Sequence, residues 1–294
     1  MNVTVVGAGG LGGYYGGLLA RAGHAVTFVA RGAHLDALRR QGGVRVQAAD
    51  GEFFGPGRAV ATPADAPPAD LVLFAVKSFD TRTAAEALAG TVAAQTAILS
   101  LQNGVDNEEV LAEVCGAGRI LGGAAYVFAT MAAPGVIAQT GGPRRVVVGE
   151  WPRGASPRVE RLAAACREAG WIVETSDDIL GEKWIKYTFI CAQAGITALT
   201  RLPVGVVRAC PPTWAMFRQL LEEATAVGRA RGVRLPDDIV ERHLALAARL
   251  EPHVSSSLAS DLAQGKRLEV EALHGTLVRY GQDARIPTPA AAAV

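Results

Sequence analysis

The sequence has almost no excess of charge of either sign. Its 294 residues include 29 lysines and arginines against 28 aspartates and glutamates, which leaves a formal net charge of +1. A protein whose main partner is nucleic acid needs a basic excess against the phosphates, so this balance argues against that class. Half of the residues are hydrophobic and 19% are charged, an ordinary globular composition that excludes an intrinsically disordered chain.

Cysteines and long apolar runs are also scarce. The four cysteines, Cys115, Cys166, Cys191 and Cys210, form no C-x-x-C pair and have no histidine at zinc-finger spacing. They predict reduced thiols in a cytoplasmic protein and no metal site. No run of 18 apolar residues is present, which predicts no membrane span and no membrane partner. The first 20 residues are uncharged, but they lack a basic segment and contain seven glycines, so we expect no signal peptide.

Lysine and asparagine are few in a chain rich in alanine, glycine and arginine. Only four of the 29 cationic residues are lysines, Lys77, Lys183, Lys186 and Lys266, and the asparagines are Asn2, Asn103 and Asn107. Against this bias, a lysine or asparagine that is retained can be one whose chemistry no other residue supplies. Scarcity alone does not show which of them matter, and most can be incidental.

The order of apolar patterns predicts two domains, as expected for a chain of this length. In the first half short apolar strands alternate with helical patterns, beginning with a strand over 2–6 and a helix over 11–22. This alternation predicts a mostly parallel sheet, which binds ligands at the carboxyl ends of its strands. After 171–174 the remaining patterns are helical, over 181–200, 212–231, 236–247 and 261–280. We therefore expect an α/β domain over 1–176 and an all-α domain over 177–294, with a frayed alanine-rich tail.

A glycine-rich turn follows the first predicted strand. Residues 7–12 read Gly-Ala-Gly-Gly-Leu-Gly, the G-x-G-x-x-G pattern between a buried strand and a helix. In this pattern Gly7 permits the tight turn, Gly9 lets a pyrophosphate approach the backbone, and Gly12 lets the helix pack closely. The helix N-terminus then offers N–H groups and partial positive charge to the phosphate. The pattern predicts a Rossmann-type dinucleotide-binding domain with Gly7, Ala8, Gly9, Gly10, Leu11 and Gly12 at the cofactor.

The end of the second predicted strand indicates which dinucleotide binds. NAD sites place an acidic residue there to hold the ribose 2′-hydroxyl, whereas this chain has Arg31. A guanidinium suits a 2′-phosphate, so the position favours NADP(H) over NAD. A solvated surface arginine is the alternative in a chain so rich in arginine.

Three of the scarce residues occupy positions that a ligand can reach. Lys77 and Asn103 each follow an apolar parallel strand, on the ligand side of the sheet. Asn103 can hydrogen-bond a nicotinamide or a substrate, although Asn-Gly is also a routine turn and Lys77 can be a loop lysine. Lys186 lies on a largely apolar helix face, and a buried lysine can serve as an acid because burial disfavours its charged form. The alternative for Lys186 is a lysine that extends to solvent.

Two further polar residues lie near the C-terminus. Ser257 can be a capping group at a helix start, and Glu269 can be an exposed charge on the helix that follows. The five histidines are scattered, and we assign none of them as a base or a metal ligand.

These residues in this order resemble the ketopantoate reductase (2-dehydropantoate 2-reductase) family. The resemblance runs nearly from end to end and rests on GAGGLG, VARGAHLDAL, FAVKSFDT, SLQNGVDNEE, ILGGAAYVFATMAAPGVIAQTG, EKWIKYTF, SSSLASDLAQGKRLEVEALHGTLVRYG and IPTP. It implies an oxidoreductase that reduces 2-dehydropantoate to pantoate with NADPH, in the biosynthesis of pantothenate and coenzyme A. It also implies a helical second domain similar to the C-terminal domain of 6-phosphogluconate dehydrogenase, and the apolar helices of that domain could support a homodimer.

The resemblance implies a role for each candidate residue. Lys186 would be the general acid that protonates the keto oxygen, and Glu269 would hydrogen-bond the new hydroxyl, help to place Lys186 and contact the cofactor. Ser257 would bind the substrate carboxylate, and Asn103 and Lys77 would line both the nicotinamide and the substrate. These roles fit the chemistry, since hydride attack on a ketone builds negative charge on oxygen that a nearby ammonium stabilises and protonates.

Two positions depart from the family pattern. The family usually carries asparagine one and two turns after the catalytic lysine, where this chain has Ile190 and Ala194, and Gln193 could supply a displaced amide. Loss of two amides can change the choice of substrate, because a pocket built for polar groups discriminates by those groups. Three hypotheses stay open: reduction of 2-dehydropantoate, reduction of a more apolar 2-keto acid, and a non-catalytic NADPH-binding sensor.

Overall fold

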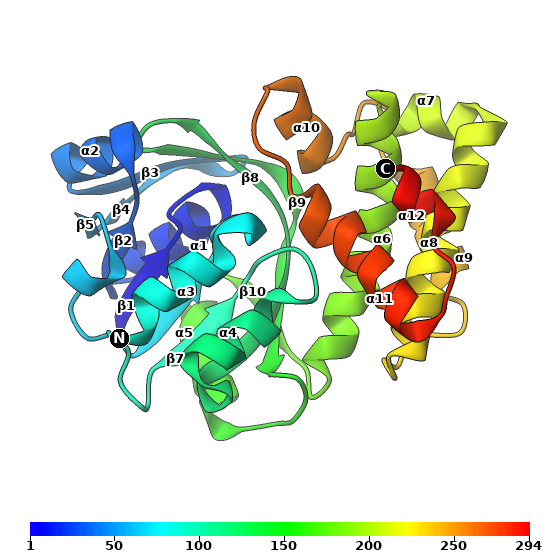
Figure 1. Ribbon diagram of the computed structural model, residues 1–294. Helices are drawn as coiled ribbons and strands as arrows, with labels where there is room; N and C mark the ends of the chain where they lie inside the picture. Colours follow the sequence, from blue (N-terminus) through cyan, green and yellow to red (C-terminus); the bar gives the residue numbers. More distant parts are fainter. The chain divides into compact units, whose positions relative to one another are not determined.

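The computed structural model covers residues 1–294, and its contacts divide the chain into two compact units (Figure 1). Unit 1 comprises Met1–Gln102 and Asn107–Leu180, and unit 2 comprises Asn103–Asp106 and Gly181–Val294. Unit 1 contains every strand, whereas the regular structure of unit 2 is helical. The predicted α/β fold followed by a helical part is confirmed, while the domain boundary expected at residue 176 stays a prediction.

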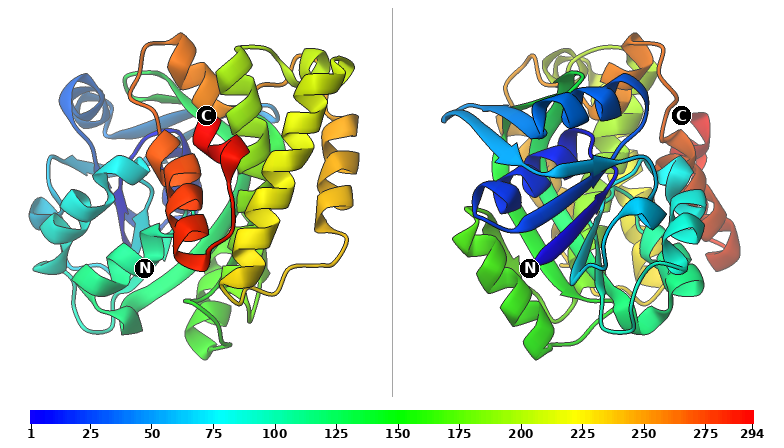
Figure 2. Two further views of the ribbon diagram at one scale, coloured as in Figure 1. Left: turned by 45° about the vertical axis from the view of Figure 1, so that its right-hand side comes forward. Right: turned by 90° about the vertical axis from the view of Figure 1, so that its left-hand side faces the viewer.

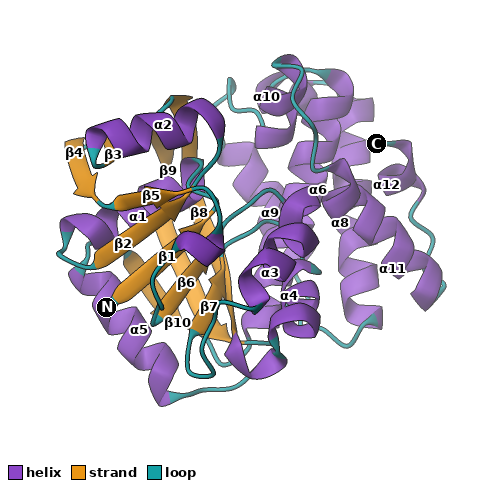
Figure 3. Ribbon diagram, turned by 60° about the vertical axis from the view of Figure 1, so that its left-hand side comes forward, coloured by secondary structure: helices purple, strands orange, loops and turns teal.

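Unit 1 is built on a ten-stranded sheet in the order β4-β3-β9-β8-β7-β6-β1-β2-β5, with β10 paired to β9 (Figure 3). The strands are β1 Asn2–Val6, β2 Ala25–Val29, β3 Gly43–Ala48, β4 Gly51–Pro56, β5 Arg58–Val60, β6 Leu71–Phe74, β7 Ala97–Ser100, β8 Ile120–Ala133, β9 Val136–Glu150 and β10 Ile172–Thr175. Strands β3 and β4 pair antiparallel, as do β8 and β9, and the other pairs are parallel. The carboxyl ends of β2, β1, β6 and β7 therefore lie along one edge of the sheet.

Helices cover both faces of this sheet, which explains why its central strands are almost continuously apolar. The helices of unit 1 are α1 Gly10–Arg21, α2 Gly32–Gln41, α3 Thr81–Ala89, α4 Asn107–Cys115 and α5 Pro157–Glu168, with short turns η1 Pro63–Asp65, η2 Ser78–Asp80 and η3 Ala117–Arg119. Tyr15 of α1 and Leu162 of α5 belong to the core on one face, together with Val5. Leu88 of α3 and Leu111 of α4 belong to the core on the other face.

The hairpin formed by β8 and β9 is much longer than the sequence pattern predicts. The two strands have 14 and 15 residues, whereas the pattern predicts strands over 119–125 and 144–151 only. The pairing shifts register between Tyr126 and Phe128, and again further along, and Arg144 adopts a positive φ of 58°. Such bulges break the alternation of inward and outward side chains, so the apolar period of two residues is lost where the strands continue.

Unit 2 is a group of helices around α8. Its elements are α6 Ile179–Thr200, which begins in unit 1, α7 Val204–Ala209, α8 Pro211–Ala230, α9 Ile239–Arg249, α10 Ser257–Ala263, the π-helix η4 Glu271–Gly275, α11 Thr276–Ala284 and α12 Pro289–Ala293. Helix α8 contacts α7, α9, α11 and α12 (Figure 2). No helix of the structure combines the length and the apolar character needed to cross a bilayer. The homodimer expected from these apolar helices stays a prediction.

The single helix expected over 261–280 is wrong. Helix α10 ends at Ala263, where Gly265 has a φ of 64° and the N–H of Lys266 donates to the carbonyl of Asp261 at 2.9 Å. This is a glycine-terminated helix end, which the left-handed conformation of Gly265 makes possible. An irregular segment follows before the π-helix η4 begins. Glu269 therefore precedes the helix instead of lying within it.

The expectation of a frayed tail is also wrong. Residues 289–293 form α12, and Ala290 and Ala291 are 6% and 2% exposed. The buried carboxylate of Glu223 accepts hydrogen bonds from the N–H groups of Ala290 and Ala291 at 2.8 and 2.9 Å. A carboxylate at this position satisfies N–H groups that have no partner within the helix. No local pattern reveals this contact, because the two ends of the first bond are 67 residues apart.

Candidate active site

The glycine-rich turn lies at the carboxyl end of β1, between β6 and β2 in the sheet. Gly7 has a φ of 94°, and a Cβ at this position would lie 2.6 Å from the backbone nitrogen of Val76. A Cβ at Gly12 would lie 2.2 Å from the carbonyl oxygen of Gly7. Both positions exclude a side chain for steric reasons, as the G-x-G-x-x-G turn requires.

Gly9 borders open space, whereas Gly10 is packed tightly against a neighbouring strand. Nothing lies within 4 Å of a Cβ placed on Gly9, which is the N-cap of α1 and provides no side chain for the first N–H groups. A Cβ on Gly10 would lie 2.1 Å from the carbonyl oxygen of Ala129 in β8. Open space at a helix N-terminus that no side chain caps suits a phosphate. The turn therefore fits a dinucleotide pyrophosphate at Gly9, while Gly10 packs the turn against β8.

His34 supports this turn, a role that the sequence did not reveal. The side chain of His34 is buried in α2; its Nε2 donates to the carbonyl of Ala8 at 2.8 Å, and its Nδ1 accepts from the N–H of Gly135 at 2.9 Å. The two bonds require the proton to be on Nε2, and they connect the glycine-rich turn to the turn between β8 and β9. The available signal is the place of His34 on the helix that starts directly after Arg31, but its partner Gly135 is 101 residues away.

Arg31 and Lys77 lie at the same edge of unit 1. Arg31 is the N-cap of α2, two residues after the end of β2, and Lys77 is the N-cap of η2, after β6. The side chain of Arg31 is 73% exposed, and its guanidinium lies 3.8 Å from the carboxylate of Asp80. Such a surface ion pair contributes little to stability, so a phosphate can replace Asp80 as the partner of Arg31. Because β2 and β6 flank β1 in parallel register, both cations lie beside the glycine-rich turn.

The structure brings Lys186 and Asn103 together in unit 2. The ammonium Nζ of Lys186, on α6, donates to Oδ1 of Asn103 at 2.8 Å, although the two residues are 83 positions apart. Lys186 is half-buried. Gly104, with a φ of 97°, turns the chain directly after Asn103. The sequence singled out both residues but could not show that they touch.

Ser257 and Glu269 also belong to unit 2. The capping role considered for Ser257 is wrong, because Ser256 caps α10: its Oγ accepts from the N–H of Ala259 at 3.1 Å and from Oγ1 of Thr197 at 2.8 Å. Ser257, the first residue of α10, is exposed. Glu269 is half-buried and lies directly before the helical segment that contains η4.

The two positions that depart from the family pattern differ in burial. Ile190, one turn after Lys186 on α6, is half-buried. Ala194, two turns after Lys186, is 2% exposed, and Gln193 is 8% exposed. An apolar residue at 194 therefore belongs to the packed interior of unit 2, and Ile190 is the replacement that remains partly accessible.

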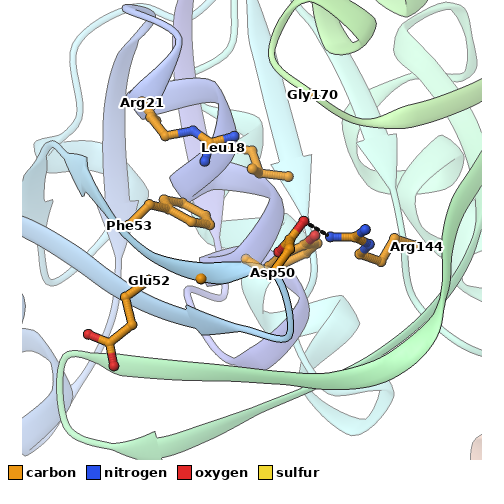
Figure 4. A pocket seen from close by; sticks show the side chains of 9 residues that line it. Leu18, Arg21, Asp50, Glu52, Phe53, Arg144 and Gly170 are labelled. Atoms are coloured by element: carbon orange, nitrogen blue, oxygen red, sulfur yellow. Dashed lines mark hydrogen bonds and ion pairs between the residues drawn. The ribbon is translucent and has the colours of Figure 1, made fainter.

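A separate cavity of about 160 Å³ lies in unit 1, lined by Leu18 and Arg21 of α1 together with Asp50, Phe53 and Arg144 (Figure 4). In this cavity the guanidinium of Arg144 pairs with the carboxylate of Asp50, and that of Arg21 lies 4.4 Å from the ring centroid of Phe53. The hydrogen bond from Arg144 lowers the pKa of Asp50. Because these groups satisfy one another, we assign the cavity no ligand.

Comparisons with known proteins cover both units. Residues 3–153 match the family described as ketopantoate reductase PanE/ApbA, and residues 178–294 match ketopantoate reductase PanE/ApbA C terminal. The 2-dehydropantoate 2-reductase of Halobacterium salinarum is 35% identical over 98% of this chain and 95% of its own length. The enzyme of the same name from Archaeoglobus fulgidus is 34% identical over 96% of this chain and 91% of its own length.

Solved structures agree with these matches. The crystal structure of a PanE/ApbA family ketopantoate reductase from Ralstonia eutropha is 39% identical, covers 99% of this chain and 95% of its own, and has a TM-score of 0.92. The 2-dehydropantoate 2-reductase from Geobacter metallireducens is 32% identical, with 99% and 97% coverage and a TM-score of 0.90. The chain therefore belongs to the ketopantoate reductase family of oxidoreductases.

Proposed function

We propose that this protein reduces 2-dehydropantoate to pantoate with NADPH, on the route to pantothenate and coenzyme A. The observation that carries the proposal is the 2.8 Å hydrogen bond from the Lys186 ammonium to the Asn103 amide oxygen. A neutral amide orients the ammonium and does not itself neutralise it, and a positively charged Lys186 can stabilise negative charge on a keto oxygen. An arrangement of this kind suits a general acid for ketone reduction.

The residues at the edge of unit 1 fit the cofactor. The backbone of residues 7–12 and the N-terminus of α1 would hold the pyrophosphate at the open position of Gly9, and Arg31 would hold the 2′-phosphate. Lys77 would contact the nicotinamide side from the end of β6. NADPH supplies the hydride when it is bound, and the protein provides orientation and charge.

In the proposed reaction, the residues of unit 2 handle the substrate. Lys186 transfers a proton from Nζ to the C2 oxygen as that oxygen gains negative charge. Asn103 orients the ammonium, and Glu269 accepts a hydrogen bond from the new hydroxyl and contacts the cofactor. The exposed hydroxyl of Ser257 binds the substrate carboxylate, since the capping role is filled by Ser256.

A second candidate is reduction of a bulkier or more apolar 2-keto acid. Half-buried Ile190 favours this alternative, because it presents an apolar surface one turn from Lys186 where the family pattern has an amide. A non-catalytic NADPH sensor has less support, because sensing has no need for an ammonium held against an amide.

The oxidation of NADPH, followed by its absorbance, tests these alternatives. We expect turnover with 2-dehydropantoate, and the same assay is run with a panel of 2-keto acids that carry larger apolar side chains. Turnover of the bulky acids without 2-dehydropantoate would support the second candidate. Absence of turnover with every acid, in a protein that binds NADPH, would support the sensor and contradict both reductase proposals.

The substitution Arg31→Ala tests the choice of cofactor. We expect it to raise the KM for NADPH about 10- to 100-fold, the loss expected for charge-assisted hydrogen bonds to a phosphate, and to leave the KM for NADH nearly unchanged. Steady-state kinetics with both cofactors measure the difference. Arg40→Ala, an exposed position on the same helix, is the matched control. Equal effects of Arg31→Ala on the two cofactors would exclude contact with the 2′-phosphate.

A further inference from the structure

The loop that carries Asn103 has both of its flanks fixed in unit 1. Nε2 of Gln102 donates to Oγ1 of Thr81, and that hydroxyl donates to Oδ1 of Asn107, each at 2.8 Å. Thr81 is 3% exposed, so these bonds are shielded from water. The four residues between the flanks, Asn103–Asp106, group with unit 2. The place of Asn103 beside Lys186 therefore depends on what holds this short loop within unit 2.

Asp106, at the far end of the loop, is held by two residues of α11. The hydroxyl of Thr276 donates to Oδ2 of Asp106 at 2.8 Å, and Nη2 of Arg279 donates to Oγ1 of Thr276 at 2.7 Å. The same guanidinium nitrogen lies 3.5 Å from Oδ2 of Asp106. Thr276 is fully buried, and the side chain of Asp106 is 25% exposed. A partly buried network with charged members is stronger and more directional than a surface ion pair.

The π-helix η4, which leads directly into α11, is attached to α6 close to Lys186. The hydroxyl of Tyr187 donates to the carbonyl of Leu273 in the π-helix η4, and Nε2 of His274 donates to the carbonyl of Cys191 at 2.8 Å. A π-helix leaves a backbone carbonyl without its usual helical partner, and such segments often occur at functional sites. The contacts thus form a closed ring that runs from Lys186 through α6, η4, Thr276 and the loop back to Asn103.

We propose that Asp106 is a positioning residue, which acts with Thr276 and Arg279 to hold the Asn103 amide against the Lys186 ammonium during reduction. The inference rests on the proposed function of the site and adds residues that do not touch the substrate. The Asn103–Lys186 contact fixes one end of a four-residue loop and the Asp106–Thr276 contact fixes the other. Loss of the second contact would let the amide shift, and a displacement of about 1 Å can cost roughly 100-fold in rate.

The test compares Thr276→Val with Thr276→Ser. Valine keeps the shape of threonine but removes the hydroxyl, whereas serine keeps the hydroxyl. We expect Thr276→Val to lower kcat about 10- to 100-fold with the KM for NADPH changed less than about twofold. We expect Thr276→Ser to restore kcat to within about threefold of the wild type. The concentration of folded enzyme is set by titration with NADPH, so that a loss of folded protein is not counted as a loss of kcat.

Thr225→Val in α8 is the matched control. Thr225 is also buried in unit 2, at 4% exposure, and its hydroxyl has no hydrogen-bond partner. Its substitution by valine removes a desolvated hydroxyl without breaking a contact, so kcat should stay unchanged and the melting temperature should stay equal or rise. A similar loss of kcat in Thr225→Val and Thr276→Val would show a general effect of packing and would overturn the positioning role.

Asp106→Ala and Asp106→Asn provide a second route if Thr276→Val does not fold. Alanine removes the acceptor, and we expect the same loss of kcat as for Thr276→Val; asparagine keeps an acceptor oxygen, and we expect a smaller loss. A folded Asp106→Ala or Thr276→Val enzyme with the kcat of the wild type would overturn the inference and leave the proposed function intact. Absence of turnover by the wild type would contradict the proposed function and the inference with it.

Discussion

Replacement of Lys186 by methionine is expected to lower kcat for reduction of the 2-keto acid by roughly 1,000-fold. Methionine retains most of the length and apolar character of the side chain, so the half-buried position on α6 stays filled. The substitution removes both the proton for the new hydroxyl and the positive charge that stabilises the developing oxyanion. Single-turnover oxidation of NADPH, with enzyme in excess over cofactor, measures the chemical step directly.

Binding of NADPH separates this prediction from a general loss of structure. The cofactor residues of the proposal, apart from Asn103 and Glu269, lie in unit 1, whereas Lys186 lies in unit 2. We therefore expect the Kd for NADPH to change less than about threefold in Lys186→Met. Lys266→Met, which changes an exposed lysine outside the proposed site, should keep the kcat of the wild type. Full activity of Lys186→Met would remove Lys186 from the mechanism.

Gly9→Ala is expected to weaken NADPH binding by about 100-fold or more while the stability of the cofactor-free protein stays nearly unchanged. No atom lies within 4 Å of a Cβ at this position, and Gly9 has a φ of −72°, so alanine fits the free protein. The added methyl group would occupy the space through which a pyrophosphate reaches the N–H groups of α1. Fluorescence titration with NADPH and thermal unfolding without it measure the two quantities.

Gly10→Ala is the matched comparison in the same turn. Its Cβ would lie 2.1 Å from the carbonyl oxygen of Ala129, so the turn and β8 must separate. We expect a loss of about 2–4 kcal/mol in the free energy of unfolding together with weaker NADPH binding. If Gly9→Ala binds NADPH as tightly as the wild type, the pyrophosphate does not lie at this turn.

Local sequence patterns were sufficient to predict the elements that position the cofactor. The strand before Gly7 is indicated by a run of β-branched residues. The glycine-rich turn, where side chains are excluded at Gly7 and Gly12, indicates the start of the helix that follows. The same patterns failed where the period of apolar residues is broken. The bulged hairpin of β8 and β9 and the segment that separates α10 from η4 are the clearest examples, because a bulge or a helix end changes which residues face the core.

The roles of individual polar side chains divide in the same way. The sequence singled out Lys186 and Asn103 by their scarcity and position, and the resemblance implied their roles. Their contact was not accessible from the sequence, since 83 residues separate them. The sequence predicted no role for three further residues, His34, Asp106 and Glu223. Each of them hydrogen-bonds a partner more than 60 residues away, which a local pattern does not reveal.

The sequence by itself determined the family, the glycine-rich turn and the order of an α/β part before a helical part. These features depend on local geometry and on the period with which side chains are buried, and both can be recognised from residues close together in the sequence. Only the tertiary structure decided which polar groups meet. Packing of distant segments brings together the Lys186 ammonium and the Asn103 amide, His34 and the glycine-rich turn, and Asp106 and Thr276. Hydrogen bonds between such distant residues produce no periodic pattern in the sequence.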